Sequence, residues 1–335
     1  MAVPDGKRLL WVDTMRGIAM LLVVLGHSIG TLTDPVNRFV LSFHMPLFFF
    51  ISGLVANTRA ADGKMKPFGG YLLKKLRLLL IPQLTMFVLT TAVDVVLKHE
   101  KLTAALLMKN LFHWFLWVLL FVSVLYWLLD AAKLLRFRWI LLPVLFAAAA
   151  LTQIFPVKTF IHAETVPMAL FFYLAGHTLR PLLEARADPA GKPSRIGMLW
   201  IGALPLIAAL SYWNAPVTMY DNFYGNLAMF FACAALGIFS VYEIAKGLQN
   251  DRALRWFGTN SIIIYVFHAS MLNALHGAGK ILIPALDGLN YTHPYYWCYF
   301  VIVCVLFVPV VYICNHWLAF LFGKRNVRRD KGETK

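Results

Sequence analysis

Long hydrophobic stretches recur along the chain and are separated by short polar connections such as DGKMKPFGG and KGLQNDRALR. A membrane-spanning helix needs about 20 mostly apolar residues. Ten segments approach this length: residues 10–33, 38–56, 78–97, 111–129, 139–156, 164–180, 196–213, 223–245, 257–278 and 295–322. The pattern predicts an all-α, polytopic integral membrane protein with about ten transmembrane helices.

The composition excludes a chain made of soluble domains. Of the 335 residues, 60% are hydrophobic and 14% are charged, against about 45–50% and about 25% in ordinary globular proteins. A soluble core could not hide this much apolar surface. We therefore expect a single transmembrane domain over residues 1–323, with a retained first span, and a basic cytoplasmic tail over residues 324–335.

The net charge of +15 would suggest a nucleic-acid partner, so the placement of the basic residues decides what it means. If the ten spans alternate, 24 of the 31 Lys and Arg residues fall on one side of the membrane and 6 on the other, with Arg16 inside the first span. Basic residues concentrate in cytoplasmic loops. The sequence therefore predicts cytoplasmic N- and C-termini, and nucleic-acid binding becomes the poorer explanation.

The first span, WVDTMRGIAMLLVVLGHS, contains ionisable residues, which are functional candidates because burying them in a membrane is costly. Asp13 and Arg16 are three residues apart and hence neighbours on a helix. Arg16 and His27 are eleven apart, three turns plus about 20°, so they share one stripe and lie about 16 Å apart along the axis. The alternatives are that Arg16 extends to the membrane interface and that His27 hydrogen-bonds a neighbouring helix.

The second predicted span contains SFHMPLFFFISG, where Pro46 and Gly53 interrupt a short apolar segment. The pattern predicts a broken helix that lines a cavity. His44 lies two residues before Pro46, where a proline kink would free backbone carbonyls and widen the bundle. An interfacial role for His44 is the alternative.

The ninth span contains WFGTNSIIIYVFH. Ser261, Tyr265 and His268 follow the spacing of one helix face. With the preceding Asn260 they predict a polar cavity wall. The four cysteines form no pair with metal-ligand spacing, and we expect no metal site.

A third feature is the basic segment TRAADGKMKPFGGYLLKKLRLLLIP, which we place in a cytoplasmic loop. It includes Lys74, Lys75 and Arg77 and ends on an apolar run with a proline. One interpretation is attraction to lipid headgroups. The other is a site for a polyanionic cytosolic ligand, because several cations can bind phosphate oxygens.

Taken together, these segments resemble the membrane acyltransferase-3 family, and within it the fucose 4-O-acetylase-like branch of polysaccharide O-acetyltransferases. The similarity runs over VDTMRGIAMLLVVLGHS, FHMPLFFFISG, YLLKKLRLLLIP, HWFLWVLLF, FFYLAGHTL and FGTNSIIIYVFH, in the family's order and across nearly the whole chain. The first motif is the most specific, because the family is marked by a basic residue, ten intervening residues and a histidine. Arg16 and His27 match it.

The resemblance implies a ten-helix enzyme of the bacterial cytoplasmic (inner) membrane. It would take an acyl group, usually acetyl, from cytoplasmic acyl-CoA and transfer it to a hydroxyl of a cell-surface glycan or its lipid-linked precursor. The implied partners are acetyl-CoA as cosubstrate, that glycan or lipid-linked sugar, and membrane lipids. Whether the chain forms a homo-oligomer stays open. Some members carry a further periplasmic hydrolase-like domain, and without one we expect direct acylation or hand-over to a separate partner.

On this resemblance, His27, Arg16 and Asp13 are the expected catalytic group. Acyl transfer to a hydroxyl needs a base, and a neutral His27 has a suitable pKa. Arg16 would orient the CoA phosphates or the pantetheine arm, with Asp13 holding its guanidinium. A covalent acyl-histidine intermediate is an alternative to direct transfer.

The other candidates are binding residues. The donor phosphates would contact Arg16, Lys74, Lys75 and Arg77. The acceptor would contact His44, Asn260, Ser261, Tyr265 and His268. A donor for the developing oxyanion would come from Asn260, Ser261 or Tyr265. A different class of function, a proton-coupled transporter or flippase for a glycolipid or acyl donor, also suits buried Arg and His residues, although we find no internal repeat.

Overall fold

The computed structural model describes residues 9–187, 195–282 and 294–323. Over these residues the chain is helical and has no β-strand, apart from two isolated bridges. The α-helices are α1 (Leu10–Ser28), α2 (Pro35–Leu41), α3 (His44–Leu54), α4 (Phe68–Val96), α5 (Ala104–Leu111), α6 (Trp114–Ala131), α7 (Arg138–Ile154), α8 (Val166–Ala185), α9 (Arg195–Gly202), α10 (Leu204–Trp213), α11 (Leu227–Gly247), α12 (Arg252–Thr259), α13 (Ser261–Leu282) and α14 (Tyr295–His316). Short 3₁₀ turns are η1 (Leu134–Phe137), η2 (Ala163–Thr165), η3 (Met219–Asp221) and η5 (Ala319–Phe322). The all-α prediction is confirmed; the predicted tail, residues 324–335, lies outside the described residues.

Each of the ten predicted segments contains a helix. Within the described parts of the chain, eight helical segments are long and apolar enough to cross a membrane. Helix α8 and the shorter apolar stretch Gly197–Trp213 are not among these eight. The chain is therefore a multi-pass membrane protein, while the count of ten spans stays a prediction.

The second predicted span is broken, but not at the proline. Helices α2 and α3 are separated at Ser42 and Phe43, before His44. Pro46 lies in the first turn of α3, where a helix needs no backbone N–H donor. The predicted kink at Pro46 is therefore wrong. At the break, the His44 ring nitrogen Nδ1 lies 2.9 Å from the Val40 carbonyl oxygen and helps to satisfy a carbonyl that the interrupted helix leaves exposed.

Helix α4 begins earlier than the apolar pattern predicts. It starts at Phe68, directly after Pro67, and not at residue 78. Residues Leu72–Arg77 are good helix formers and carry the helix beyond the apolar run. Lys74, Lys75 and Arg77 therefore lie on the first turns of a helix, and their predicted loop position is wrong.

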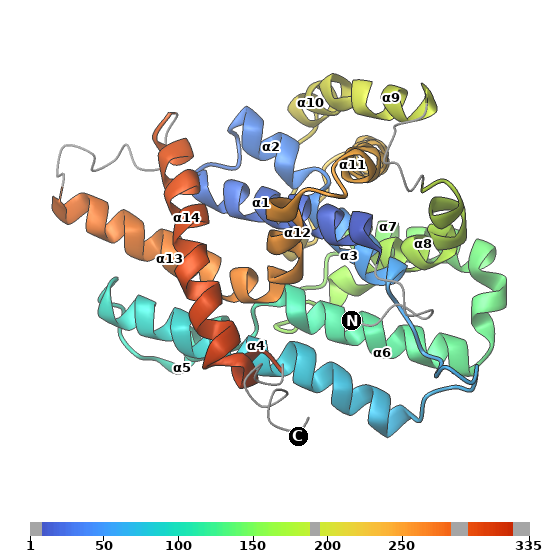
Figure 1. Ribbon diagram of the computed structural model, residues 1–335, viewed down its shortest axis with the longest axis horizontal. Coiled ribbons are helices and arrows are strands. Elements are labelled where there is room, and N and C mark those ends of the chain that lie inside the picture. The colour runs from blue at the N-terminus through green and yellow to red at the C-terminus, as the bar shows by residue number, and fades with distance from the viewer. Residues whose placement is uncertain (1–8, 188–194, 283–293, 324–335) are drawn as a thin grey trace.

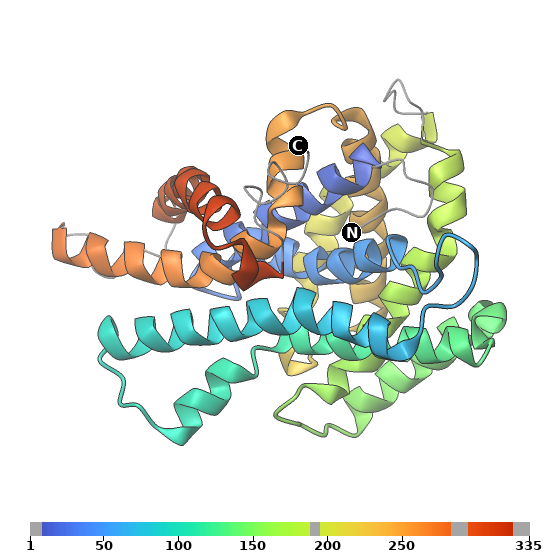
Figure 2. The same cartoon turned by 60° about the horizontal axis from the view of Figure 1, so that its bottom comes forward.

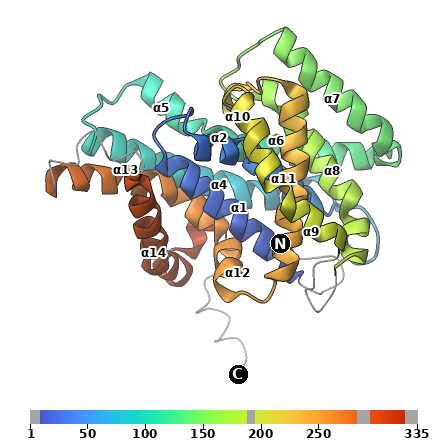
Figure 3. The ribbon, with the colours of Figure 1, turned by 90° about the horizontal axis from the view of Figure 1, so that it is seen from above.

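Helix α1 lies near the middle of the bundle (Figures 1 and 3), where it contacts α2, α3, α11, α12, α13 and α14. It meets α12 backbone to backbone. A Cβ atom on Gly17 would lie 1.9 Å from the Leu254 carbonyl oxygen, and one on Gly258 would lie 1.8 Å from that of Asp13. Small residues let membrane helices approach this closely. The segment that carries Arg16 and His27 is thus held in the interior.

A second close pair consists of α3 and α8. A Cβ atom on Gly53 would lie 1.8 Å from the Tyr173 carbonyl oxygen, and one on Gly176 would lie 2.0 Å from that of Phe50. Helix α4 packs along α6 (Figure 2), and α6 also packs on α8. Helix α7 lies at the edge of the bundle (Figure 3) and packs mainly on α8. These contacts place the α3–α4 connection beside the C-terminal ends of α6 and α8.

Candidate active site

A pocket of about 790 Å³ lies where the α3–α4 connection, the α6–α7 connection and the end of α8 meet. We call it the basic pocket. Its cations are Arg59, Lys66, Lys74, Arg136, Arg138 and Arg180. Among its described lining residues, Asp130 is the one carboxylate. All of these cations come from connections that the sequence assigns to the cytoplasmic side, so the structure brings together residues that were predicted to share a side.

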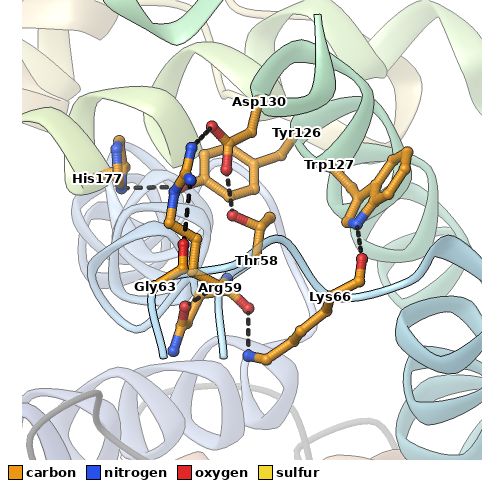
Figure 4. A network of polar contacts seen from close by, with 9 residues as sticks. Thr58, Arg59, Gly63, Lys66, Tyr126, Trp127, Asp130 and His177 are labelled. Carbon is orange, nitrogen blue, oxygen red and sulfur yellow. Dashed lines mark hydrogen bonds and ion pairs between the residues drawn. The ribbon is translucent and has the colours of Figure 1, made fainter. Parts of the chain in front are cut away.

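The wall of the basic pocket is held by a polar network (Figure 4). Asp130, on α6, accepts hydrogen bonds from Thr58 and from Arg59, the latter at 3.0 Å. The indole N–H of Trp127 donates to the Lys66 carbonyl oxygen at 3.1 Å. These bonds attach the α3–α4 connection to α6 at two places, at Thr58 and Arg59 and again at Lys66. The connection is therefore a fixed part of the pocket.

The cations of the basic pocket outnumber the carboxylates that pair with them. Asp130 pairs with Arg59, and Glu184 pairs with Arg180 at 2.7 Å. No carboxylate of the described chain pairs with the other cations, Lys66, Lys74, Arg136 and Arg138. Burial, and then the charge of Lys74, lower the pKa of Lys66 below its usual value. Such a site favours a ligand with several negative charges.

A second cavity, of about 240 Å³, lies beside the N-terminal ends of α3 and α6 and the middle of α4. We call it the histidine cavity. Its wall contains His27 from α1, His113 from the start of α6, and Tyr265 and His268 from α13. Apolar and aromatic residues complete the lining: Val23, Met45, Phe48, Met86, Trp114, Phe115, Tyr220 and Ala269. Met45 lies in the first turn of α3, whose other end leads into the basic pocket.

His27 and His268 are in ring contact in this cavity. Their ring centroids are 4.7 Å apart and the ring planes are inclined at 68°. His27 is exposed, whereas His268 is only 2% exposed. The Nδ1 atom of His268 lies 2.6 Å from the Tyr265 carbonyl oxygen. Because a carbonyl can only accept, Nδ1 carries the proton and Nε2 is the basic nitrogen.

His113 and His44 are held in the same way. The Nδ1 atom of His113 lies 2.9 Å from the carbonyl oxygen of Asn110, whose own side chain donates to Asp94 at 2.9 Å. His44 is buried at the α2–α3 break and does not line the cavity. Within the described residues no group of three His, Cys, Asp or Glu side chains could hold a metal ion.

His113 and Tyr220 were not predicted as site residues. His113 immediately precedes α6 and Tyr220 lies in η3, so neither belongs to a recognisable helix face. The only available signal is the His-Trp pair that opens HWFLWVLLF. Tyr220 is 44% exposed, so it lines the cavity and also reaches the surface of the protein.

Several predicted residues lie away from both pockets. Arg16 contacts Asp13 at 3.6 Å, as their spacing predicts, but lines neither pocket. Asn260 lies at the α12–α13 junction, where its side chain donates to the Trp256 carbonyl oxygen and accepts from Asn315, both at 2.9 Å. The structure thus gives Asn260 a role in joining α12 to α14.

The remaining predicted residues divide in the same way. Ser261 begins α13 and lines neither pocket. Lys74 lines the basic pocket, and Lys75 lines a smaller adjoining pocket of about 210 Å³ that shares Lys66 and Lys74. Arg77, one turn farther along α4, lines neither. Of the predicted face of α13, Tyr265 and His268 line the histidine cavity. Of the three residues singled out in the basic segment, Lys74 lines the basic pocket and Lys75 the adjoining one.

Comparison with known families decides how these two pockets are interpreted. The family model described as an acyltransferase domain matches residues 9–316, which include both pockets. The chain belongs to the membrane acyltransferase-3 family. No curated protein and no solved structure matches it. As a member of the acyltransferase-3 family the protein is a membrane acyltransferase, which favours the enzyme over the carrier alternative.

Proposed function

We propose that this acyltransferase transfers an acetyl group from acetyl-CoA, bound at the basic pocket, to a hydroxyl of a cell-surface glycan or its lipid-linked precursor, bound at the histidine cavity. The observation that carries the proposal is the pairing of the two pockets. The basic pocket contains four cations without a carboxylate partner among the described residues, and the histidine cavity, which α3, α4 and α6 also help to line or border, contains His27, His113 and His268. The expected location is the bacterial inner membrane, with the basic pocket facing the cytoplasm.

The basic pocket suits coenzyme A because the nucleotide end of that molecule carries a diphosphate and a 3′-phosphate. Arg136 and Arg138 offer planar guanidinium groups, which bind phosphate in a bidentate manner. Lys66 and Lys74 add point charges from the α3–α4 connection and the start of α4. The phosphates of acetyl-CoA would neutralise the pocket cations that have no carboxylate partner among the described residues.

The distance between the pockets fits the thioester arm. Phe115 lines the histidine cavity and Tyr126 lines the basic pocket, and both lie on α6. Eleven residues of helix correspond to about 16 Å. The arm of coenzyme A from phosphate oxygen to sulfur has roughly twelve bonds, as many as four peptide residues, and extends about 14 Å. With its diphosphate in the basic pocket, the donor would reach the region of His27.

The chemistry at the cavity requires a base and an oxyanion donor. His27 is exposed in the cavity and would accept the proton of the acceptor hydroxyl. Of the three predicted oxyanion donors, Tyr265 is the one that lines the cavity, so we assign the role to its hydroxyl. Arg16 keeps the proposed role of orienting the arm, which the family motif supports. The aromatic lining near Tyr220 would pack against the acceptor where it enters.

The proposal is tested with purified protein in lipid nanodiscs and radiolabelled acetyl-CoA. We expect release of free CoA and transfer of label to glycan or lipid-linked sugar from membranes of the source cells. Mass spectrometry of surface glycans from cells with and without the gene should then differ by one acetyl group on a defined sugar. Movement of label across the bilayer without thioester cleavage would overturn the proposal in favour of a carrier.

A further inference from the structure

The His27–His268 contact contains an unexplained buried atom. His268 is almost fully buried and its Nδ1 proton is used by the Tyr265 carbonyl oxygen, yet its Nε2 atom has no hydrogen-bond partner. An unsatisfied buried acceptor costs about 1–3 kcal/mol. The structure gives no packing reason for placing a histidine there, because an apolar side chain would fill the same space without that cost.

His27 supplies the matching donor. It forms no hydrogen bond with any described residue, and its ring is exposed, lines the cavity and contacts the ring of His268. Two imidazoles joined by an N–H···N bond of about 3 Å have centroids about 5 Å apart. The observed separation of 4.7 Å is close to this value, so the proposed bond requires a change in the orientation of the His27 ring and no large change in the distance between the rings.

We propose that His268 is a positioning residue for His27: its Nε2 atom accepts the N–H of His27, so that the other ring nitrogen of His27 presents its lone pair to the acceptor hydroxyl. The inference rests on the proposed acyl transfer. A base in hydrolases and transferases is commonly oriented by a carboxylate. The described lining of the histidine cavity contains no carboxylate, and His268 takes that place as a neutral acceptor.

The other histidines do not compete for this role. His44 uses its Nδ1 proton at the α2–α3 break and His113 uses its own at the α5–α6 junction. Neither ring is in contact with His27, whereas that of His268 is. The contact with His27 therefore distinguishes His268 among three histidines that share one tautomer.

The proposed acetyl transfer needs only acetyl-CoA and the acceptor hydroxyl as reactants. The acceptor oxygen forms a bond to the acetyl carbon while the carbon–sulfur bond breaks, and the hydroxyl proton passes to His27. The His27 imidazolium keeps its other N–H bonded to His268, which stabilises the new charge. The proton then goes to the CoA thiolate, and both histidines return to the neutral state.

The test compares His268→Ala and His268→Gln with the wild-type protein in membranes that contain the acceptor. We expect His268→Ala to lower kcat about 100-fold and to leave the KM for acetyl-CoA within about twofold, because the donor phosphates bind at the other end of α6. Glutamine offers an amide oxygen as acceptor, so the kcat of His268→Gln should be at least about tenfold higher than that of His268→Ala. His316→Ala is the matched control, since His316 also bonds a backbone carbonyl, that of Tyr312, but lies outside both pockets.

A second measurement is independent of turnover. Carbethoxylation by diethylpyrocarbonate attacks an unprotonated ring nitrogen, and the bond to His268 makes that nitrogen of His27 more nucleophilic. Mass spectrometry should show His27 labelled at least about threefold more slowly in His268→Ala than in wild type, with His316 as internal reference. If wild type transfers acetyl but His268→Ala keeps its kcat, or if His27 labelling is unchanged, the positioning role is refuted. A wild-type protein that cleaves no acetyl-CoA refutes the proposed function itself.

Discussion

Replacing Lys74 by alanine removes a cation from the basic pocket, whereas replacing Arg77 removes one from the same helix outside it. The two residues are three positions apart on α4 and both are exposed. A hydrogen bond to a charged group contributes about 1.5–3 kcal/mol, and the exposure of Lys74 points to the lower end. About 1.4 kcal/mol corresponds to tenfold. We therefore expect Lys74→Ala to raise the KM for acetyl-CoA about tenfold, with kcat unchanged.

The assay is the initial rate of CoA release in nanodiscs of fixed lipid composition, measured at two salt concentrations. Raising the salt from 0.01 M to 1 M shortens the Debye length from about 30 Å to about 3 Å, so the difference between Lys74→Ala and wild type should shrink. Arg77→Ala should match wild type throughout. Equal increases in KM for the two variants would refute the reasoning, because the basic segment would then act as a diffuse attractive charge and not through the pocket.

Three further predictions test the site and the packing. His27→Ala should abolish acyl transfer, measured as CoA release, while the protein inserts and accumulates normally. Arg16→Ala should reduce acetyl-CoA binding or turnover at least about tenfold, or ~1.4 kcal/mol; an unchanged dependence on acetyl-CoA would return Arg16 to an interfacial role. Gly258→Ala would place a Cβ atom 1.8 Å from the Asp13 carbonyl oxygen, so the α1–α12 contact must open at a cost of about 1–3 kcal/mol. Its Tm in nanodiscs should fall, whereas Gly69→Ala, with nothing within 4 Å of the added atom, should leave it unchanged.

The helices were predictable because a membrane requires long apolar runs, and every predicted segment is helical. The ends of the helices were harder to predict. Hydropathy reports the part of a helix that lies in lipid, so the polar first turns of α4 were assigned to a loop. Pro46 could end one helix or begin another, and only the chain direction at Ser42 and Phe43 decides that it lies in the first turn of α3.

The site was predictable where one helix carries the whole pattern. His27 on the unbroken helix α1 and Tyr265 and His268 on α13 line the histidine cavity, whereas Arg16 and Ser261 on the same two helices line neither pocket. Asn260 belongs to the turn before α13, so helical periodicity did not apply to it. His113 enters the cavity from a helix junction, and its neighbours there come from distant parts of the chain. Such tertiary contacts leave no periodic signal in the sequence.

The separation of the two pockets has a consequence for the proposed reaction. Moving the phosphates of coenzyme A toward His27 would bring several charges into an aromatic and apolar cavity that offers no cation among its described lining residues, and burying unpaired charge is costly. The thioester arm carries no charge and avoids that cost. The donor would therefore stay at the basic pocket while only its acetyl end reaches the histidine cavity. The acceptor, entering near Tyr220, would meet the acetyl group without either substrate crossing the bundle.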